Sequence, residues 1–341
     1  MHKLFVTGGA GFIGSAFIRM ALAEIPDCQV VNFDALTYAG NLDSLEGLDE
    51  KRHRFVRGDI CDREAVHAAL EDETAAIINF AAESHVDRSI ASADEFLRTN
   101  ILGTQFLLDA ARERGVRRFV QISTDEVMGS LPDDDRAFFT ESSPFAPNSP
   151  YSASKAAAEH LVRAAHHTFG LDTVITRCGN NYGPRQFPEK FLPLMLSNAL
   201  HDEAIPLYGD GKYVRDWIYV EDHCRAIMMV MQKGRSGEAY NIGARNERRN
   251  IEVAESVLKT LGKPLTLIRH VKDRPGHDRR YAIDPTRIET ELGWRPRETW
   301  ETGLQKTINW YAENGDWISR ARSGEYREFY ARQYGTEVGA Q

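Results

Sequence analysis

The chain has 341 residues, of which 42% are hydrophobic and 27% are charged, and its formal net charge is −8. This balance is typical of a globular protein with one large domain or two smaller ones. The negative charge argues against nucleic acid or an anionic membrane surface as a partner, and no apolar run approaches the roughly 18 residues of a membrane span.

The four cysteines are scattered and form no C-x-x-C pair. Such spacing is typical of a reducing compartment and predicts neither disulfides nor a zinc site. A strand-like segment starts within three residues of the N-terminus, so we expect no signal peptide. These features together predict a cytoplasmic protein that holds no metal.

The first half of the chain alternates short apolar runs with helical patterns. Strands are predicted over 4–6, 29–33, 54–56, 75–80 and 118–123, and a helix over 96–114 separates the last two. Alternation of this kind indicates parallel β-α-β units. The runs are apolar on both faces, as in a sheet that helices cover on both sides. The expected fold is α/β, a Rossmann-type doubly wound parallel sheet.

Beyond about residue 178 the alternation loosens, and Gly, Pro and Asn cluster over 180–184. We predict a dinucleotide-binding domain over 1–177, to which the chain returns around 217–245. A smaller, discontinuous α/β substrate domain over 178–330, partly interleaved with the first, is expected to follow. The segment after residue 317 is polar, and its last few residues are expected to fray.

A glycine-rich turn joins the first strand to the first helix. Gly8, Gly11 and Gly14 satisfy the spacing that lets a dinucleotide pyrophosphate approach the helix N-terminus. Asp34 ends the second strand 20 residues after Gly14, where a ribose-binding carboxylate is expected. Ala35 supplies no cation for a 2′-phosphate, so NAD is favoured over NADP. Around this turn the predicted cofactor contacts are Gly8, Gly11, Phe12, Ile13, Gly14, Asp34, Ala35, Leu36 and Thr37, with Asp59 and Ile60 near the adenine.

Tyr151 and Lys155 stand four residues apart just after Pro150, which suits the first turn of a helix. That spacing puts both side chains on one helical face. A nearby ammonium and a positively charged nicotinamide ring would lower the pKa of the tyrosine and make it a base. The pair is therefore predicted to be catalytic and to contact the cofactor.

With these motifs the sequence resembles the extended short-chain dehydrogenase/reductase family from residue 4 to about 317. The resemblance is carried by TGGAGFIG over 7–14 and by Tyr-x-x-x-Lys over 151–155. Within that family the chain is most similar to the dTDP-glucose 4,6-dehydratases. The motifs that carry this closer similarity are AAESHVDRS (81–89), STDEV (123–127), NNYGP (180–184), PEK (188–190), VRDW (214–217) and DRPGHD (273–278).

The triplet Thr124, Asp125 and Glu126 follows a predicted strand, at the end where ligands bind in this architecture. Adjacent Asp and Glu side chains supply the acid and the base that elimination of water requires. The resemblance implies that Tyr151 deprotonates the C4 hydroxyl as hydride passes to NAD, while Thr124 holds the oxygen and Lys155 keeps Tyr151 acidic. Glu126 would then take the C5 proton and Asp125 protonate the leaving C6 hydroxyl, before hydride returns to C6.

The same resemblance implies the remaining contacts and the assembly. Ala81, Ala82, Thr99 and Asn181 would lie near the cofactor. Substrate contacts would come from Ser84, His85, Thr124, Asn180, Lys190, Phe191, Pro206, Tyr208, Arg215, Asn250, Arg274 and His277. Arg215 and Arg274 would bind the pyrophosphate of a nucleotide sugar; a hairpin strand explains Pro206 and Tyr208 equally well. A homodimer through the helices that carry Phe96 and Tyr151 is expected.

Two positions depart from the family pattern. Met128 stands where tyrosine is usual, and Gly179 stands where Cys or Ser commonly precedes Asn-Asn. Met128 follows the catalytic carboxylates closely, so it could reshape the sugar pocket or be a neutral packing change.

Other functions stay open at this point. A UDP-sugar dehydratase or 4-epimerase of the same family is one alternative, and Asp125 with Glu126 argues against the epimerase. A non-catalytic NAD-binding regulatory module is another, and the presence of Tyr151 and Lys155 argues against it.

Overall fold

The computed structural model describes residues 3–133 and 136–322. Its centre is a seven-stranded sheet in the order β10-β6-β5-β4-β1-β2-β3, with every neighbouring pair parallel. The strands are β1 (Lys3–Thr7), β2 (Gln29–Asp34), β3 (His53–Arg57), β4 (Ala76–Asn79), β5 (Arg118–Thr124), β6 (Thr173–Cys178) and β10 (Ala239–Ile242). The predicted Rossmann-type sheet is confirmed, and each strand predicted in the first half is present.

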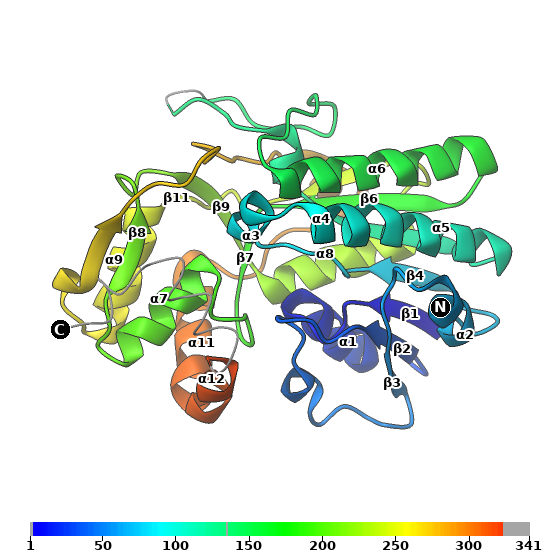
Figure 1. Cartoon of the computed structure of the whole chain (residues 1–341), viewed down its shortest axis with the longest axis horizontal. Helices are drawn as coiled ribbons and strands as arrows, with labels where there is room; N and C mark the ends of the chain where they lie inside the picture. Colours follow the sequence, from blue (N-terminus) through cyan, green and yellow to red (C-terminus); the bar gives the residue numbers. More distant parts are fainter. Residues whose placement is uncertain (1–2, 134–135, 323–341) are drawn as a thin grey trace.

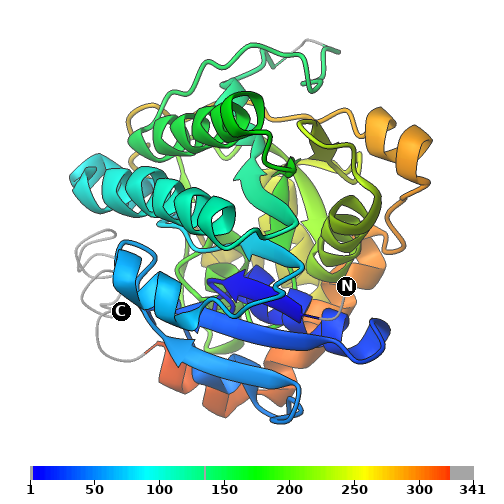
Figure 2. The same cartoon turned by 90° about the vertical axis from the view of Figure 1, so that its right-hand side faces the viewer.

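Helices cover both faces of this sheet (Figures 1 and 2). One layer holds α2 (Arg63–Ala69), α5 (Thr104–Glu113) and α6 (Pro150–Phe169), and the other holds α1 (Phe12–Glu24) and α8 (Val220–Lys233). Strand β1 shows why both layers are needed. Leu4 and Val6 are buried in the cluster with α1 and α8, whereas Phe5 is buried with α2, α5 and α6. Successive strand residues point to opposite faces, and burying each such side chain contributes about 1.5–3 kcal/mol.

The helix predicted over 96–114 is interrupted. The chain forms α3 (Val86–Ala91), α4 (Asp94–Phe96), a π-helical segment η2 (Leu97–Gly103) and then α5. Single turns of π-helix inside an α-helix are frequent at functional sites. Here the segment carries Asn100, whose side chain reaches the main chain of Glu83.

The second half adds two small sheets beside the large one. Strands β7 (Asn180–Tyr182), β9 (Val214–Tyr219) and β11 (Glu247–Arg249) form one, in which β9 lies between a parallel β7 and an antiparallel β11. Strands β8 (Ile205–Tyr208) and β12 (Ile268–Val271) form the other. Because β8 and β12 are parallel, the alternative that residues 206–208 belong to a hairpin is wrong.

Four helices complete this half: α7 (Phe191–Leu200), α9 (Asn250–Leu261), α11 (Trp300–Glu313) and α12 (Gly315–Ala321). They share an aromatic-rich core in which Tyr182 contacts Trp217 and Trp300. In Figure 1 these helices and β8 lie at the left, and the seven-stranded sheet lies at the right. Short 3-10 turns occupy η1 (Leu42–Leu45), η3 (Asp125–Met128) and η4 (Leu265–Leu267).

The chain returns to the large sheet after β9. Helix α8 packs against α1, strand β10 pairs with β6, and α10 (Thr286–Leu292) packs on α8 and β10. The division into domains over 1–177 and 178–330 stays a prediction, and the tail expected to fray lies outside the described residues. Within the described ranges, no helix is long and apolar enough to cross a membrane.

Candidate active site

A cavity of about 480 Å³ lies at the carboxyl ends of the parallel strands, where the sheet faces β8, β9 and α7. In the sheet order the connections change direction between β1 and β4, which is where ligands bind in open α/β sheets. All residues predicted to bind cofactor or substrate, or to act in catalysis, line this cavity, with the exception of Leu36. Leu36 has a φ of 54° and donates its amide to Asp34 Oδ1 at 2.8 Å, so it shapes the turn through its main chain.

The glycine-rich turn brings the main chain close to the cavity. Gly8 has a φ of 68°, and a Cβ there would lie 2.6 Å from the Ala81 amide nitrogen. A Cβ on Gly14 would lie 2.3 Å from the Gly8 carbonyl oxygen, so only glycine allows the turn to close. Gly11 caps α1 without a side-chain acceptor for the first helical N–H groups. These groups are free to hold a phosphate, and the turn therefore fits a dinucleotide pyrophosphate.

Asp34 closes the far end of the cofactor region. Its Oδ2 accepts the Ala10 amide at 2.8 Å, its Oδ1 accepts the Leu36 amide, and burial raises its pKa. The surrounding lining residues are Ala35, Thr37, Ala39, Gly40 and Asp59, none of which is a cation. A ribose diol fits this carboxyl, whereas a 2′-phosphate would meet negative charge, so the residues present fit NAD.

Tyr151 and Lys155 lie in the first turns of α6. Ser149 caps the helix by accepting the Ser152 amide at 3.1 Å, and Pro150 occupies its first turn. Tyr151 is buried and hydrogen-bonded to the Thr124 hydroxyl, and the Lys155 ammonium donates to the Ile122 carbonyl at 2.6 Å. Burial lowers the pKa of Lys155 to about 8.

Burial dominates the pKa of Tyr151 in the protein without cofactor. Burial raises it well above its usual value, and the neighbouring Glu126 charge raises it further. In the protein without cofactor, desolvation of a buried phenolate opposes ionisation. The lowering expected from Lys155 and a bound nicotinamide stays a prediction. Ionisation of Tyr151 requires additional positive charge at the site.

Strand β5 delivers the three other predicted catalytic residues. Thr124 ends the strand and caps η3 by accepting the Glu126 amide at 3.3 Å. Its hydroxyl lies 3.3 Å from Asp125 Oδ1. Asp125 is buried, whereas Glu126 is partly exposed to the cavity. One strand end thus holds a hydroxyl, a buried carboxyl group and a carboxyl group open to the cavity.

The two carboxyl groups have different electrical surroundings. Burial raises the pKa of both. At Asp125 the charges of Glu126 and Asp216 raise the pKa further, and only Arg215 opposes them strongly. At Glu126 three cations, Arg274, Arg215 and Lys190, lower it. Asp125 is therefore set to keep its proton and Glu126 to lose it, which is how one site supplies both an acid and a base.

Asp125 also presents an atom without a partner. Its Oδ2 is buried and makes no hydrogen bond to any described residue. A buried polar oxygen costs free energy unless a ligand satisfies it. A substrate hydroxyl in the cavity would complete it.

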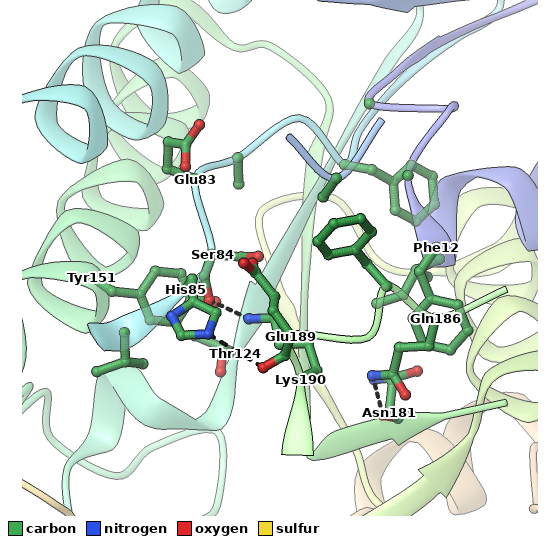
Figure 3. A pocket seen from close by; sticks show the side chains of 18 of the residues that line it. Phe12, Glu83, Ser84, His85, Thr124, Tyr151, Asn181, Gln186, Glu189 and Lys190 are labelled. Atoms are coloured by element: carbon green, nitrogen blue, oxygen red, sulfur yellow. Dashed lines mark hydrogen bonds between the residues drawn. The ribbon is translucent and has the colours of Figure 1, made fainter. Parts of the chain in front are cut away.

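The predicted substrate residues meet in the same cavity but are held by protein partners. The Lys190 ammonium donates to the Ser84 carbonyl at 2.6 Å (Figure 3). Arg215 donates to the carbonyls of Val214 and Asp278, at 2.7 and 2.9 Å.

Arg274 and His277 are anchored in a similar way. The Arg274 guanidinium pairs with Asp87 at 3.3 Å, and its Nε is buried without an acceptor among the described residues. The His277 ring stacks on Tyr213 with centroids 3.6 Å apart and pairs with Asp273 at 2.7 Å. Burial and the two arginines lower the pKa of His277 to about 3, so its ring is neutral.

Figure 3 shows how the lining residues are arranged. Tyr151, Thr124 and His85 lie together on one side of the pocket, and Phe12, Gln186 and Asn181 lie on the other. Gln186 donates to the Asn181 carbonyl at 3.0 Å, and Glu189 accepts a hydrogen bond from Arg88 at 3.0 Å. The binding or catalytic roles of Tyr151, Thr124, His85, Phe12 and Asn181 stay predictions.

Several lining residues were not predicted. Asp87, Glu189 and Trp217 lie inside the motifs quoted above, and that position was the available signal. Gln186, Phe187 and Tyr281 lie outside those motifs. Tyr281 follows Arg280, which forms an antiparallel bridge with Leu131. The Arg215 guanidinium lies over the Tyr281 ring, 4.2 Å from its centroid. Only the tertiary structure shows such contacts.

The two departures from the family pattern occupy different places. Met128 is buried in a cluster with Val127, Phe139, Ala156 and Tyr281 and does not line the cavity. Its position supports the packing alternative. Gly179 does line the cavity, and a Cβ there would lie 2.5 Å from the Asp216 carbonyl oxygen.

Fold and site together define an enzyme of the extended short-chain dehydrogenase/reductase type. A Rossmann-type sheet carries a dinucleotide turn, a Tyr–Lys pair and two carboxyl groups at its switch point. Across residues 3–133 and 136–322, no cluster of side chains is suited to hold a metal ion.

Comparison with known proteins narrows this class. The family model described as GDP-mannose 4,6 dehydratase matches residues 5–307, and the chain belongs to this family. A dTDP-glucose 4,6-dehydratase of Xanthomonas campestris pv. campestris (strain B100) is 51% identical over 347 residues, which cover 96% of this chain and 98% of that protein.

Solved structures agree with this grouping. The crystal structure of a dTDP-glucose 4,6-dehydratase from Streptomyces venezuelae, with NAD bound, has a TM-score of 0.90 and 50% identity, and the match covers 94% of this chain and 99% of that one. A UDP-glucose 4-epimerase of Thermus thermophilus in complex with NAD has a TM-score of 0.85 at 31% identity, covering 92% and 99%. The fold is common to both activities, and the identity is higher to the dehydratase.

Proposed function

We propose that this protein converts dTDP-glucose to dTDP-4-keto-6-deoxyglucose with NAD as a cofactor that is regenerated in each turnover. The observation that carries the proposal is the pair Asp125 and Glu126, whose surroundings favour opposite protonation states. Elimination of water between C5 and C6 needs an acid and a base besides the tyrosine that serves C4 oxidation, and a 4-epimerisation does not need this additional pair. Relatives at about half identity that are named dTDP-glucose 4,6-dehydratase support the choice of substrate.

The first step oxidises C4 of the sugar. A bound NAD would supply the hydride acceptor for C4 and, once reduced, the hydride donor for C6. Tyr151 takes the proton of the C4 hydroxyl. The Thr124 hydroxyl, which is hydrogen-bonded to Tyr151, orients the C4 oxygen. Because burial opposes ionisation of Tyr151, the positive charges of Lys155 and of the bound cofactor are both needed to stabilise the phenolate.

The second step eliminates water between C5 and C6. The new 4-ketone acidifies the C5 proton, which Glu126 removes. Asp125 gives its proton to the C6 hydroxyl, which leaves as water, and a C5–C6 double bond forms. Hydride addition at C6 and return of the proton from Glu126 to C5 give the 4-keto-6-deoxy sugar. The unpartnered Asp125 Oδ2 supports the position of the C6 hydroxyl beside that carboxyl group.

The nucleotide part would lie on the opposite side from the dinucleotide turn. Arg215 and Arg274 are the cations of β9 and of the 273–278 segment that line the cavity, and they suit a pyrophosphate. Pro206 and Tyr208 of β8 line the same end and offer a flat surface for the base. Tyr208 also donates to Asp87 at 3.0 Å, which joins this surface to the partner of Arg274.

We further propose that the protein is a homodimer of the cytoplasm. Leu97 and Leu102 of η2 and Ile90 of α3 are large apolar side chains with 46%, 52% and 39% of their surface exposed. They lie in the layer with α5 and α6, where helices of a second copy would bury them. All four cysteines are free thiols, which suits a reducing compartment.

The test compares three nucleotide sugars with purified protein and no added NAD. Loss of one water from dTDP-glucose, faster than from UDP-glucose or GDP-mannose, is the expected result. Conversion of UDP-glucose in preference would reject the thymidine nucleotide, and interconversion to a 4-epimer without water loss would reject the dehydratase. A protein without bound NAD that stays inactive after NAD is added would reject catalysis.

A further inference from the structure

Asp216 is a buried carboxyl group that the reaction above does not use. It lies in β9 between Arg215 and Trp217, which both line the cavity, but it does not line the cavity itself. Its Oδ1 accepts the Asn246 amide at 2.8 Å, and its Oδ2 is buried and has no hydrogen-bond partner among the described residues. The main-chain amides of Asn246, Arg245 and Ala244 favour its ionised form, but burial outweighs them, so the charge is costly for the structure to keep.

The main chain is built to bring Asp216 close to the catalytic strand. Thr124 of β5 is paired in register with Cys178 of β6, and Gly179 follows directly. A Cβ on Gly179 would lie 2.5 Å from the Asp216 carbonyl oxygen, and one on Gly243 would lie 2.5 Å from Asp216 Oδ2. Two glycines therefore enclose Asp216 where a larger side chain would push it away. Asp125 directly follows Thr124 in the chain, next to this contact in the strand register.

We propose that Asp216 is a positioning residue for the elimination step, whose buried negative charge holds the proton on Asp125 until the C6 hydroxyl takes it. The inference rests on the proposed function for its catalytic meaning. The charge relation between the two carboxyl groups does not depend on that function.

The charges around both groups support this role. Asp125 faces Glu126 on its own turn, Arg215 and Asp216 on β9, Tyr151 on α6 and Cys178 on β6. Asp216 raises the pKa of Asp125, and Arg215 lowers it. Asp216 itself faces Glu247 on β11, and burial raises its pKa to about 7. Glu247 is paired with Arg280 at 2.8 Å. Asp216 forms no salt bridge with any residue of 3–133 or 136–322.

The matched variants are Asp216→Asn and Asp222→Asn. Asparagine at 216 keeps an acceptor for the Asn246 amide and removes the charge. Asp222 is a good control because it is equally buried and also accepts main-chain amides, those of Arg297 and Glu298 at 3.0 and 2.9 Å. It lies on α8 and does not line the cavity. A purely structural role of Asp216 would make the two variants behave alike.

The readout is the infrared C=O stretch of protonated Asp125 in the substrate-free holoenzyme, assigned by its loss in Asp125→Asn. In Asp216→Asn this band should disappear at a pH lower by about one than in the wild type, because a like charge has been removed. In Asp222→Asn it should disappear at the wild-type pH. An unchanged titration in Asp216→Asn would overturn the proposal.

A second readout needs no variant at 216. In the wild-type protein the Asp125 band should change frequency as the pH rises through about 7, where Asp216 ionises. A band that keeps its frequency there would also overturn the proposal. Both readouts are made without substrate, so failure of the proposed dehydration, seen as no loss of water from any nucleotide sugar, is recorded separately.

Discussion

Asp125 and Glu126 are neighbours in sequence but differ in what surrounds them. Asp125 is buried beside other carboxyl groups, whereas Glu126 faces Arg274, Arg215 and Lys190. Asp125 therefore keeps its proton, whereas Glu126 loses its own. Amide variants at these positions should stop the reaction at different points.

Asp125→Asn should keep C4 oxidation and C5 deprotonation but lose protonation of the leaving hydroxyl. We expect kcat to fall by about 10²–10⁴ and reduced cofactor to accumulate, with the C5 proton still exchanging with solvent. Glu126→Gln, in contrast, should lose both the elimination of water and the exchange of the C5 proton. Cofactor absorbance and exchange into deuterated water measure the two effects. C5 exchange at the wild-type rate in Glu126→Gln would contradict this assignment.

Asp216 also predicts how stability depends on pH. Its pKa is raised to about 7 from an ordinary 3.8, so the stability gained from its protonated form is full below about 4 and lost as the pH rises through 7. Asp216→Asn should therefore gain stability relative to the wild type between pH 5 and pH 8. The gain between these two pH values is about 3 kcal/mol at most, because only the interval from pH 5 to about 7 contributes. Denaturant unfolding at both pH values measures it, and an equal difference at the two would contradict the burial of an ionisable carboxyl group.

For single residues, the sequence predicted which side chains line one site but not how burial shifts their pKa values. The glycine turn, Asp34, and Tyr151 with Lys155 are defined by short spacings, so they could be found without a structure. The pair between Asp87 and Arg274 joins residues 187 positions apart, and no local spacing encodes it. Burial raises the pKa of Tyr151 in the protein without cofactor, and burial cannot be read from a four-residue spacing; the lowering expected in the complex with NAD stays a prediction.

Among the elements, the main chain just before β7 approaches β9 closely at Gly179. A Cβ at that position meets a main-chain oxygen at 2.5 Å, which cannot move as a flexible side chain could. The two strands must separate for any larger residue. This contact also fixes the position of the Asp216 main chain next to Gly179.

Gly179→Ala should therefore destabilise the protein by about 1–3 kcal/mol in denaturant unfolding. Gly315→Ala is the control, because nothing lies within 4 Å of a Cβ there and its φ is unstrained. That substitution should be neutral or slightly stabilising. Equal stability of the two variants would show that β9 yields easily at this point.

The π-helical segment η2 has a similar positioning effect. Asn100 accepts the Glu83 amide at 2.9 Å and donates to the Glu83 carbonyl at 3.0 Å and to Ser154 at 2.8 Å. One buried amide thus ties the 81–85 loop to the helix of Tyr151 and Lys155. The sequence predicted a continuous helix here, because the apolar spacing that indicates a helix does not distinguish an inserted residue.

At the scale of the molecule, the large sheet supplies the cofactor turn and the catalytic residues, and the elements after β6 supply the arginines. The return of α8 and β10 to the sheet fixes these parts against each other. The fold class was predictable because strands and helices alternate regularly in the first half. The small sheets were not, since their pairings β7–β9 and β8–β12 join distant segments.

The exposed apolar side chains Ile90, Leu97 and Leu102 lead to a prediction about the oligomeric state. Leu102→Glu should convert a dimer to a monomer in light scattering, because a carboxylate would be buried at the interface. Leu265→Glu is the matched control, with 54% exposure against 52%, on η4 away from that layer. A wild-type monomer, or a dimer that survives Leu102→Glu but not Leu265→Glu, would place the interface elsewhere or remove it.

The most direct test follows a deuterium label through one turnover. The protein is mixed with dTDP-glucose deuterated at C4, without added NAD, and the product is analysed by mass and NMR. We expect loss of one water and recovery of the deuterium at C6 of a 4-keto-6-deoxy sugar. Water loss with the deuterium released to solvent would contradict the internal hydride transfer, and no water loss with this substrate would contradict the proposed function itself.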